Sequence, residues 1–129
     1  YLENNKIEVK AVADLREAVG WDRREAKLKK VLGKTFFHAA AFDGDKLIGF
    51  VEVISDGVDD AFIRNLLVHP DYQRSGIAVN LLNRVLKRLK EDQIKTVNVL
   101  FEPELKRLYQ QVGFKIICGG LIDNEREGF

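Results

Sequence analysis

The segment from Gln73 to Ala78 reads Q-R-S-G-I-A, and its residue types suit the binding of an anion. It leads directly into a helical pattern, and the first turn of a helix carries backbone N–H groups with no intrahelical partner. The helix dipole adds partial positive charge at the same end. Gly76 lets a ligand approach the backbone, Arg74 adds a cation and small Ala78 leaves the first turn uncluttered. The segment could therefore hold a phosphate or pyrophosphate group.

Two common phosphate-binding motifs are absent from the sequence. There is no G-x-x-x-x-G-K-[ST], so a P-loop nucleotidase is disfavoured, and no G-x-G-x-x-G, so the dinucleotide fingerprint is missing. Many helices begin after a glycine without binding anything. From the loop alone, a simple helix N-terminus stays open as the alternative.

The elements that position this loop are a strand before it and a helix after it. Residues 61–68 form an apolar run that predicts a strand, and apolar residues from Ile77 to Leu89 recur at helical spacing. Upstream, residues 36–42 and 46–54 predict two strands joined by an Asp-Gly turn. We therefore expect three consecutive antiparallel strands before the loop.

The two ends of the chain supply the remaining predicted elements. Alternation over residues 6–12 predicts a first strand, Asp14 is a candidate cap for a helix that stops at Gly20, and residues 23–32 predict a very basic second helix. Downstream we expect a strand over 96–101, a helix from Pro103 to Gly113, a strand over 114–118 and an edge strand at 121–122. This order predicts an α/β (α+β) fold, a mixed sheet with helices on both faces.

Composition limits the classes of protein that fit. The 129 residues suit a single domain over residues 1–129, with 46% hydrophobic and 32% charged residues, as in globular proteins. A net charge of +1 gives no reason to expect a nucleic-acid or membrane partner. The single cysteine, Cys118, excludes an internal disulfide framework and a cysteine metal cluster. With no visible signal peptide or membrane span, we expect a cytoplasmic protein.

Several segments taken together resemble the GCN5-related N-acetyltransferases, the GNAT superfamily. The loop matches that family's Q/R-x-x-G-x-G/A signature, and R-L-Y-Q-Q-V-G-F resembles its second signature, a tyrosine-bearing helix that ends in Gly-Phe. L-R-E-A-V-G-W-D and D-G-D-K-L-I-G-F-V-E-V resemble its N-terminal helix and second hairpin. The resemblance covers nearly the whole chain. It implies the GNAT fold, a mixed, mostly antiparallel sheet whose strands splay apart at the acyl-CoA site.

Within the superfamily, the pieces V-G-W, I-S-D-G, V-H-P-D-Y-Q and V-L-F-E-P look most like small arylalkylamine-type acetyltransferases. That likeness of pattern does not identify the acceptor. Small members of the superfamily often dimerise, which leaves a homodimer open.

The resemblance also assigns residues to acetyl-CoA. It implies that the backbone of Leu66, Leu67 and Val68 holds the pantetheine arm, with the Val68 N–H donating to the thioester carbonyl. It assigns the pyrophosphate to the loop and first helical turn, that is, to Arg74, Ser75, Gly76, Ile77, Ala78 and Val79.

Tyr109 matches the family tyrosine that protonates the departing thiolate, and a phenol stays protonated at neutral pH. A tyrosine packed in the core is the structural alternative. Seven residues earlier the family often carries an asparagine that touches the cofactor. This chain has Glu102 there, so no cofactor contact is carried over to that position.

The sequence does not identify a general base. Glu52 and Asp56 should border the cleft but suit surface roles equally, His38 is expected in a strand, and His69 beside a proline is expected in a turn. Trp21 and the basic second helix could shape the acceptor site or simply pack.

The resemblance predicts an acetyl-CoA-dependent N-acetyltransferase that acts on a small-molecule or peptide amine by direct attack in a ternary complex. Neither signature contains a cysteine, which disfavours an acyl-enzyme. Two alternatives remain: a non-catalytic acyl-CoA sensor or interaction module on the same fold, and a scaffold without a ligand.

Overall fold

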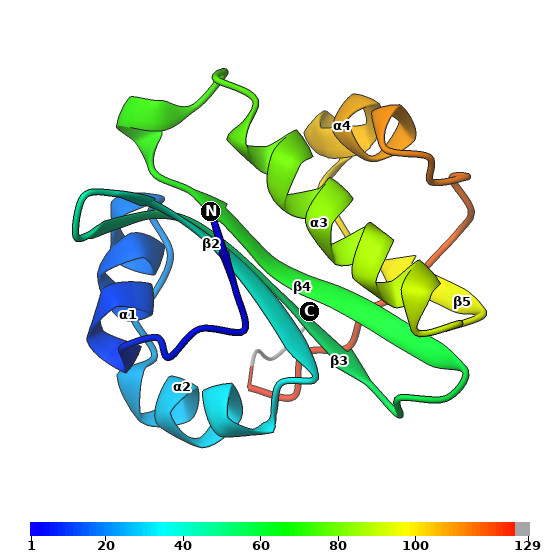
Figure 1. The fold of residues 1–129 in the computed structure, drawn as a ribbon, viewed down its shortest axis with the longest axis horizontal. Helices are drawn as coiled ribbons and strands as arrows, with labels where there is room; N and C mark the ends of the chain where they lie inside the picture. The colour runs from blue at the N-terminus through cyan, green and yellow to red at the C-terminus, as the bar shows by residue number, and fades with distance from the viewer. Residues whose placement is uncertain (126–129) are drawn as a thin grey trace. The chain divides into compact units, whose positions relative to one another are not determined.

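A five-stranded sheet in the order β1-β2-β3-β4-β5 is the centre of the computed structural model, which describes residues 1–125 (Figure 1). The first four strands pair antiparallel and β5 runs parallel to β4. Their bounds are β1 Leu2–Glu3, β2 Phe37–Asp43, β3 Lys46–Ser55, β4 Asp60–Val68 and β5 Thr96–Val99. The three predicted antiparallel strands and the mixed sheet are thus confirmed.

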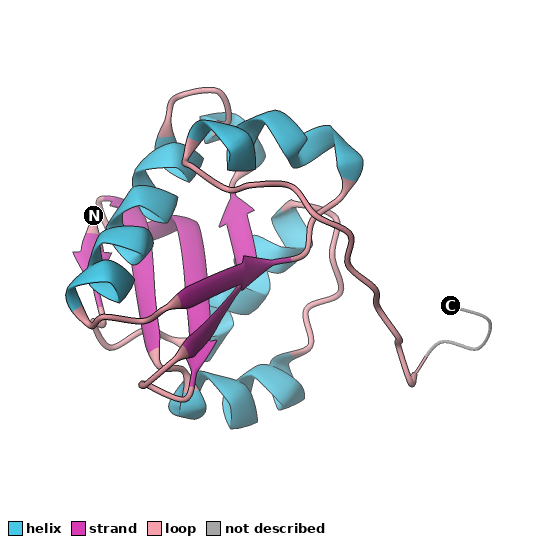
Figure 2. Ribbon diagram, turned by 90° about the vertical axis from the view of Figure 1, so that its right-hand side faces the viewer, coloured by secondary structure: helices cyan, strands magenta, loops and turns pink. Residues whose placement is uncertain are grey.

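Helices cover both faces of this sheet. Helices α1 (Val9–Ala18) and α2 (Glu25–Val31) lie on one face and α3 (Ile77–Glu91) lies on the other, as Figures 1 and 2 show. Short 3₁₀ turns, η1 (Leu32–Lys34) and η2 (Pro70–Tyr72), complete the first of two compact units, which spans Tyr1–Val99. This arrangement confirms the predicted mixed sheet with helices on both faces.

Successive side chains of a strand point to opposite faces of the sheet, so apolar residues of the strands pack into a core on each side. On the α1–α2 side, Phe50 and Leu67 pack with Val12 and Leu15. On the other side, α3 approaches β3 so closely that a Cβ at Gly49 would lie 2.8 Å from the Ile77 Cγ2 atom. That close approach favours glycine at this position and packs the start of α3 against the sheet.

The predicted first strand over residues 6–12 is wrong, because α1 already begins at Val9. Val12, Ala13 and Arg16 are all buried, and their helical spacing, rather than the alternation before them, determines the structure. Asp14 is not a cap. It lies within α1 and forms ion pairs with Lys10 and Arg23.

The second unit begins at Leu100 and contains η3 (Pro103–Leu105) and α4 (Lys106–Gln111). The predicted helix after Pro103 is confirmed, but the strands predicted over 114–118 and 121–122 are wrong. Among the described residues no strand pairs with these segments. Ile117 and Ile122 are exposed, so their apolar pattern has neither a partner strand nor a core to bury it.

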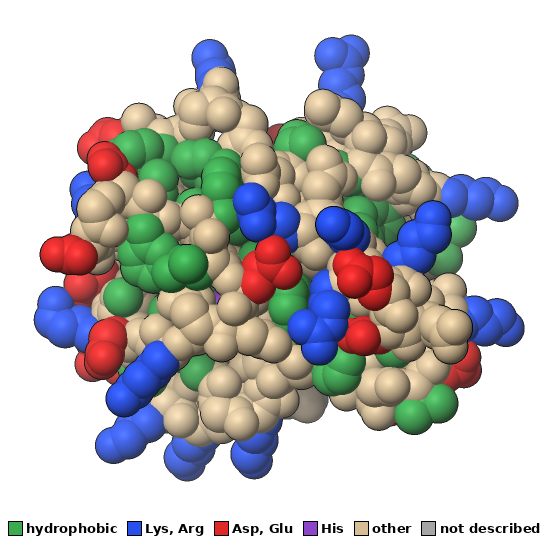
Figure 3. All heavy atoms as spheres, in the orientation of Figure 1, with side chains coloured by type: hydrophobic (Ala, Val, Ile, Leu, Met, Phe, Trp, Pro, Cys, Tyr) green, Lys and Arg blue, Asp and Glu red, His purple; other side chains and the backbone are tan. Residues whose placement is uncertain are grey.

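None of the helices within residues 1–125 combines the length and apolar character that a membrane crossing requires. Acidic and basic side chains are mixed over the face in Figure 3, with Lys and Arg gathered along the edge where Figure 1 shows α2.

Candidate functional site

Among the described residues, the C-terminal half of β4 has a strand neighbour on one side only. β5 pairs with residues 60–63 of β4 and then ends, whereas β3 accompanies β4 as far as Val68. Residues 64–68 therefore leave one edge of β4 open inside the sheet. This is the splaying that the sequence resemblance predicts.

Backbone hydrogen bonds show which peptide groups face the open edge. The His69 N–H donates to the Ile48 carbonyl of β3 at 2.8 Å. Since successive residues of a strand direct their N–H groups to opposite sides, the Val68 N–H points away from β3. The Val68 carbonyl on that side accepts a bond from the Gln73 amide at 3.2 Å. The Val68 N–H is thus directed to the open edge of β4.

The connection from β4 to α3 is held in a defined shape. The His69 ring accepts a bond from the Asp71 N–H at 3.1 Å, which confirms His69 as a turn residue. Tyr72 bonds to Asp43 and so ties the loop to the β2–β3 hairpin. Two loop residues have positive φ, Arg74 at 64° and Gly76 at 82°. The left-handed conformation at Gly76 favours glycine because it has no Cβ.

The N-terminus of α3 presents unpaired backbone donors. Gly76 is the N-cap, and its carbonyl accepts the first helical bond, from the Asn80 N–H at 3.0 Å. The N–H groups of Ile77, Ala78 and Val79 therefore have no intrahelical partner, and no side chain of the described residues caps them. A Cβ at Gly76 would meet no heavy atom within 4 Å beyond its chain neighbours, so a ligand could approach here.

The predicted cofactor residues follow one another in the first unit, from the end of β4 through the loop to the first turn of α3. Leu66 and Val68 direct their backbone groups to the open edge, whereas the same alternation turns the Leu67 backbone toward β3, and its side chain is buried. Arg74 and Ser75 form the loop, and the remaining residues are Gly76, Ile77, Ala78 and Val79. The Ile77 side chain is buried, so Ile77 can contribute only its backbone. The arrangement fits a flexible arm that ends in a pyrophosphate.

Tyr109 lies in the second unit, on α4, and is buried. Its ring stacks on Phe101 with centroids 4.5 Å apart and meets the edge of Phe114 at 5.7 Å. Burial raises the pKa of the Tyr109 phenol to about 12. The phenol therefore keeps its proton throughout the neutral range, as a proton donor must.

Glu52 is the most deeply buried carboxylate among the described residues. Its Oε1 atom accepts bonds from Arg64 Nε and, at 2.9 Å, from the Asn65 amide, while its Oε2 atom has no hydrogen-bond partner within residues 1–125. Arg16 extends this network by donating to the Asn65 side-chain oxygen at 3.2 Å. Sequence reasoning identified Glu52 as a titratable group near the cleft but did not find this network.

A β-bulge in β4 brings the network together. Between β3 and β4 the register shifts, so that Glu52 pairs with Arg64 while Phe50 pairs with Leu67. The extra residue Asn65 has a positive φ of 53°, and the bulge directs the Arg64 and Asn65 side chains to the same face. Asparagine is unusual inside an apolar strand, so Asn65 was the feature of the sequence that could have indicated the bulge.

The other candidate bases have structural roles. Asp56 Oδ1 accepts three backbone N–H bonds, from Val58, Asp59 and Asp60, and these bonds, that from Asp59 most of all, lower the Asp56 pKa. His38 lies in β2, as expected, where burial lowers its pKa and Asn5 contacts its ring at 3.0 Å. Neither residue has the environment of an activated base.

Comparison with known proteins places the chain in a family. A family model described as an acetyltransferase (GNAT) domain matches residues 10–124. An uncharacterized N-acetyltransferase, ycf52, from Gracilaria tenuistipitata var. liui is 30% identical over 116 residues. That match covers 86% of this chain and 64% of the relative, so the chain spans less than two thirds of that relative's length.

Solved structures share the fold. A probable acetyltransferase from meticillin-resistant Staphylococcus aureus superimposes with a TM-score of 0.85 at 21% identity, over 95% of this chain and 98% of that one. An aminoglycoside 6'-N-acetyltransferase, solved in complex with coenzyme A, has a TM-score of 0.73 at 16% identity, over 92% and 87% of the two chains. With the family model matching nearly the whole sequence, this chain belongs to the GNAT family of acetyltransferases.

Proposed function

We propose that the protein is an acetyl-CoA-dependent N-acetyltransferase that moves an acetyl group to a primary amine by direct attack in a ternary complex, with residues 1–129 acting as one domain. The observation that carries the proposal is the open edge of β4, which continues into the uncapped N-terminus of α3. Family membership and the solved relative that holds coenzyme A support the choice of cofactor.

Bound acetyl-CoA would supply the acetyl group as a thioester, which the amine nitrogen attacks with release of the thiol. The Val68 N–H would stabilise negative charge on the carbonyl oxygen, an effect worth about 3 kcal/mol for one well-placed donor. The N–H groups of Ile77, Ala78 and Val79, with Arg74, would hold the pyrophosphate. Tyr109 would donate a proton to the leaving sulfur. The base that removes the amine proton is not assigned.

The single cysteine of the chain, Cys118, lies in the second unit and outside both signature segments. Direct transfer is therefore the favoured route over a cysteine acyl-enzyme. The arylalkylamine likeness and the cytoplasmic location remain predictions, as does the homodimer.

Calorimetric titration with acetyl-CoA tests whether the loop and the N-terminus of α3 bind the pyrophosphate. Gly76→Glu should abolish measurable binding, because the new carboxylate would occupy the open space beside the helix N-terminus and repel the phosphates. Gly20→Glu is the matched control. Gly20 also has a positive φ, 87°, with open space around it, but follows α1.

Loss of binding in Gly76→Glu but not in Gly20→Glu would support a pyrophosphate site at the start of α3. Equal affinity for acetyl-CoA in both variants would refute that site. Binding by the unmodified protein without turnover on a broad panel of amines would favour a non-catalytic acyl-CoA sensor instead.

A further inference from the structure

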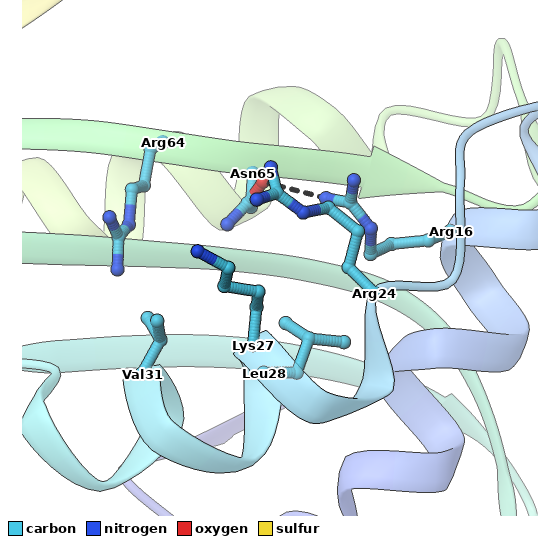
Figure 4. A pocket seen from close by; sticks show the side chains of 7 residues that line it. All are labelled: Arg16, Arg24, Lys27, Leu28, Val31, Arg64 and Asn65. Atoms are coloured by element: carbon cyan, nitrogen blue, oxygen red, sulfur yellow. Dashed lines mark hydrogen bonds between the residues drawn. The ribbon is translucent and has the colours of Figure 1, made fainter. Parts of the chain in front are cut away.

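A pocket of about 240 Å³ opens on the α1–α2 face of the sheet in the first unit (Figure 4). At liquid density this volume holds roughly eight water molecules, so it suits a small ligand group. Residues of α1, of α2 with its N-cap, and of β4 line it: Arg16, Arg24, Lys27, Leu28, Val31, Arg64 and Asn65. We call it the basic pocket.

The lining is strongly cationic. Arg16, Arg24, Lys27 and Arg64 contribute four positive charges to the lining, and Glu52, which pairs with Arg64, offsets one of them. The pKa of Arg16 is lowered, first by burial and next by the charge of Arg24, against the opposing influence of Asp22 and Glu52.

Hydrogen bonds hold Arg16 and Arg64 in place, whereas Arg24 and Lys27 are exposed residues at the rim of the pocket. Arg16 donates from Nε to the Asp22 carbonyl at 2.7 Å and from a terminal nitrogen to Asn65 at 3.2 Å. Arg64 is fixed by its bond to the buried Glu52. Figure 4 shows the Lys27 side chain extending from α2 toward the strand that carries Arg64 and Asn65. Prepositioned guanidinium groups recognise carboxylates and phosphates through paired hydrogen bonds.

The basic pocket also lies close to the proposed acetyl site. Asn65 is three residues from Val68 on β4, no more than about 10 Å along an extended strand. The pocket opens on the α1–α2 face, whereas α3 lies on the opposite face. One molecule could thus place an amine near Val68 and an acidic group in the basic pocket.

We propose that the basic pocket binds the carboxylate or phosphate group of the acceptor, so that the preferred acceptor is a small amine that carries an anionic group. This inference rests on the proposed acetyltransferase function. The pocket's affinity for an anion can nevertheless be measured without any turnover.

The test compares three amines: γ-aminobutyrate, phosphoethanolamine and uncharged n-butylamine. Each is assayed for acetylation by the full chain, and each is titrated calorimetrically into the protein with and without CoA. Lys27→Gln and Arg24→Asn remove one charge each, and asparagine suits the positive φ of 52° at position 24. Lys30→Gln is the matched control, because Lys30 is an exposed residue of α2 outside the pocket lining.

We expect the anionic amines to be favoured over n-butylamine. Each pocket variant should raise KM for them about tenfold with little change in kcat, since one charge-assisted hydrogen bond is lost. KM for n-butylamine should not change, and Lys30→Gln should behave like the unmodified protein. A carboxylate and a phosphate are distinguished by which of the two anionic amines responds more strongly to the variants.

A preference for n-butylamine, or anionic amines unaffected by both pocket variants, would overturn the proposal. Failure of the proposed function would look different, with no acetyl-CoA binding or no acetylated product. Even then, titration with γ-aminobutyrate shows whether the basic pocket binds an anion. Binding weakened by Lys27→Gln supports an anion site, and absence of binding by either anionic amine refutes it.

Discussion

Tyr109 has two properties that an exposed tyrosine lacks: an aromatic enclosure and a raised pKa. Its ring is held between Phe101 and Phe114, and burial raises its pKa to about 12. The aromatic contacts hold the ring in place, and the raised pKa keeps the phenol protonated at neutral pH. The role came from a resemblance to a family motif. The aromatic enclosure could not be predicted, because it depends on residues that only folding brings together.

Tyr109→Phe should lower kcat for amine acetylation by at least about tenfold, within the usual range for loss of a general acid. The Kd for acetyl-CoA should change little, because the cofactor contacts proposed above are backbone groups of β4 and α3. Steady-state assays measure kcat, and calorimetry measures the Kd for acetyl-CoA. The unfolding midpoint of the variant is the control for correct folding, and it should not change because phenylalanine keeps the aromatic stack. A parallel loss of kcat and affinity would contradict the proton-donor role.

Glu52 shows how a residue can be recognised as unusual from sequence without its partners being identified. A charged residue within the apolar run of β3 stands out, but nothing in its neighbours specifies Arg64 and Asn65, which are more than ten positions away. The pairing depends on the bulge at Asn65, which a regular strand pattern does not encode. A buried, paired carboxylate is costly to create and is therefore well suited to fix the cations around it.

At the level of elements, the predictions succeeded where one structural period continued over many residues. Helix α3 and the hairpin of β2 and β3 have long, consistent patterns and were predicted to within two residues. The first helix was predicted with its end near Gly20 but with its start too late, because alternation over residues 6–12 mimics a strand. The C-terminal strands failed because a β pattern forms a strand only where a hydrogen-bonding neighbour exists.

The contact between α3 and β3 at Gly49 yields a stability prediction. Gly49→Ala should lower the free energy of unfolding by about 1–3 kcal/mol, because its Cβ would crowd Ile77 and Leu81 in a packed interface. Gly33→Ala is the matched control, since a Cβ there meets nothing within 4 Å and its φ is not in the left-handed region. Urea unfolding of both variants measures the difference. A Gly49→Ala protein as stable as Gly33→Ala would mean that α3 shifts to accommodate the methyl group.

At the scale of the whole molecule, the net charge is close to zero although positive charge is concentrated at the basic pocket. Twenty-one basic and twenty acidic side chains almost cancel, yet four cations line the basic pocket and the Glu52 carboxylate pairs with one of them. Composition could not reveal a pocket assembled from α1, β4 and the start of α2, because it reports only the summed charge. Such information depends on tertiary structure.

Ligand binding should also be visible in the stability of the whole chain. If acetyl-CoA binds only the folded protein, a free concentration one hundred times Kd should raise the free energy of unfolding by about 2.7 kcal/mol. Thermal unfolding with and without acetyl-CoA measures this, with Gly76→Glu expected to show no shift and Gly20→Glu a full one. A stabilisation that persists in Gly76→Glu would place the ligand elsewhere on the molecule.

The open edge of β4 has a further consequence, for aggregation. Unpaired backbone groups at a sheet edge are templates on which other chains can add strands. Here the unpaired stretch is only five residues long, over positions 64–68, with the kink of the Asn65 bulge at one end and the Pro70 turn just beyond the other. An invading strand would find too few regularly spaced partners to remain bound. The protein can therefore keep an edge open for a ligand without exposing a surface on which fibrils readily grow.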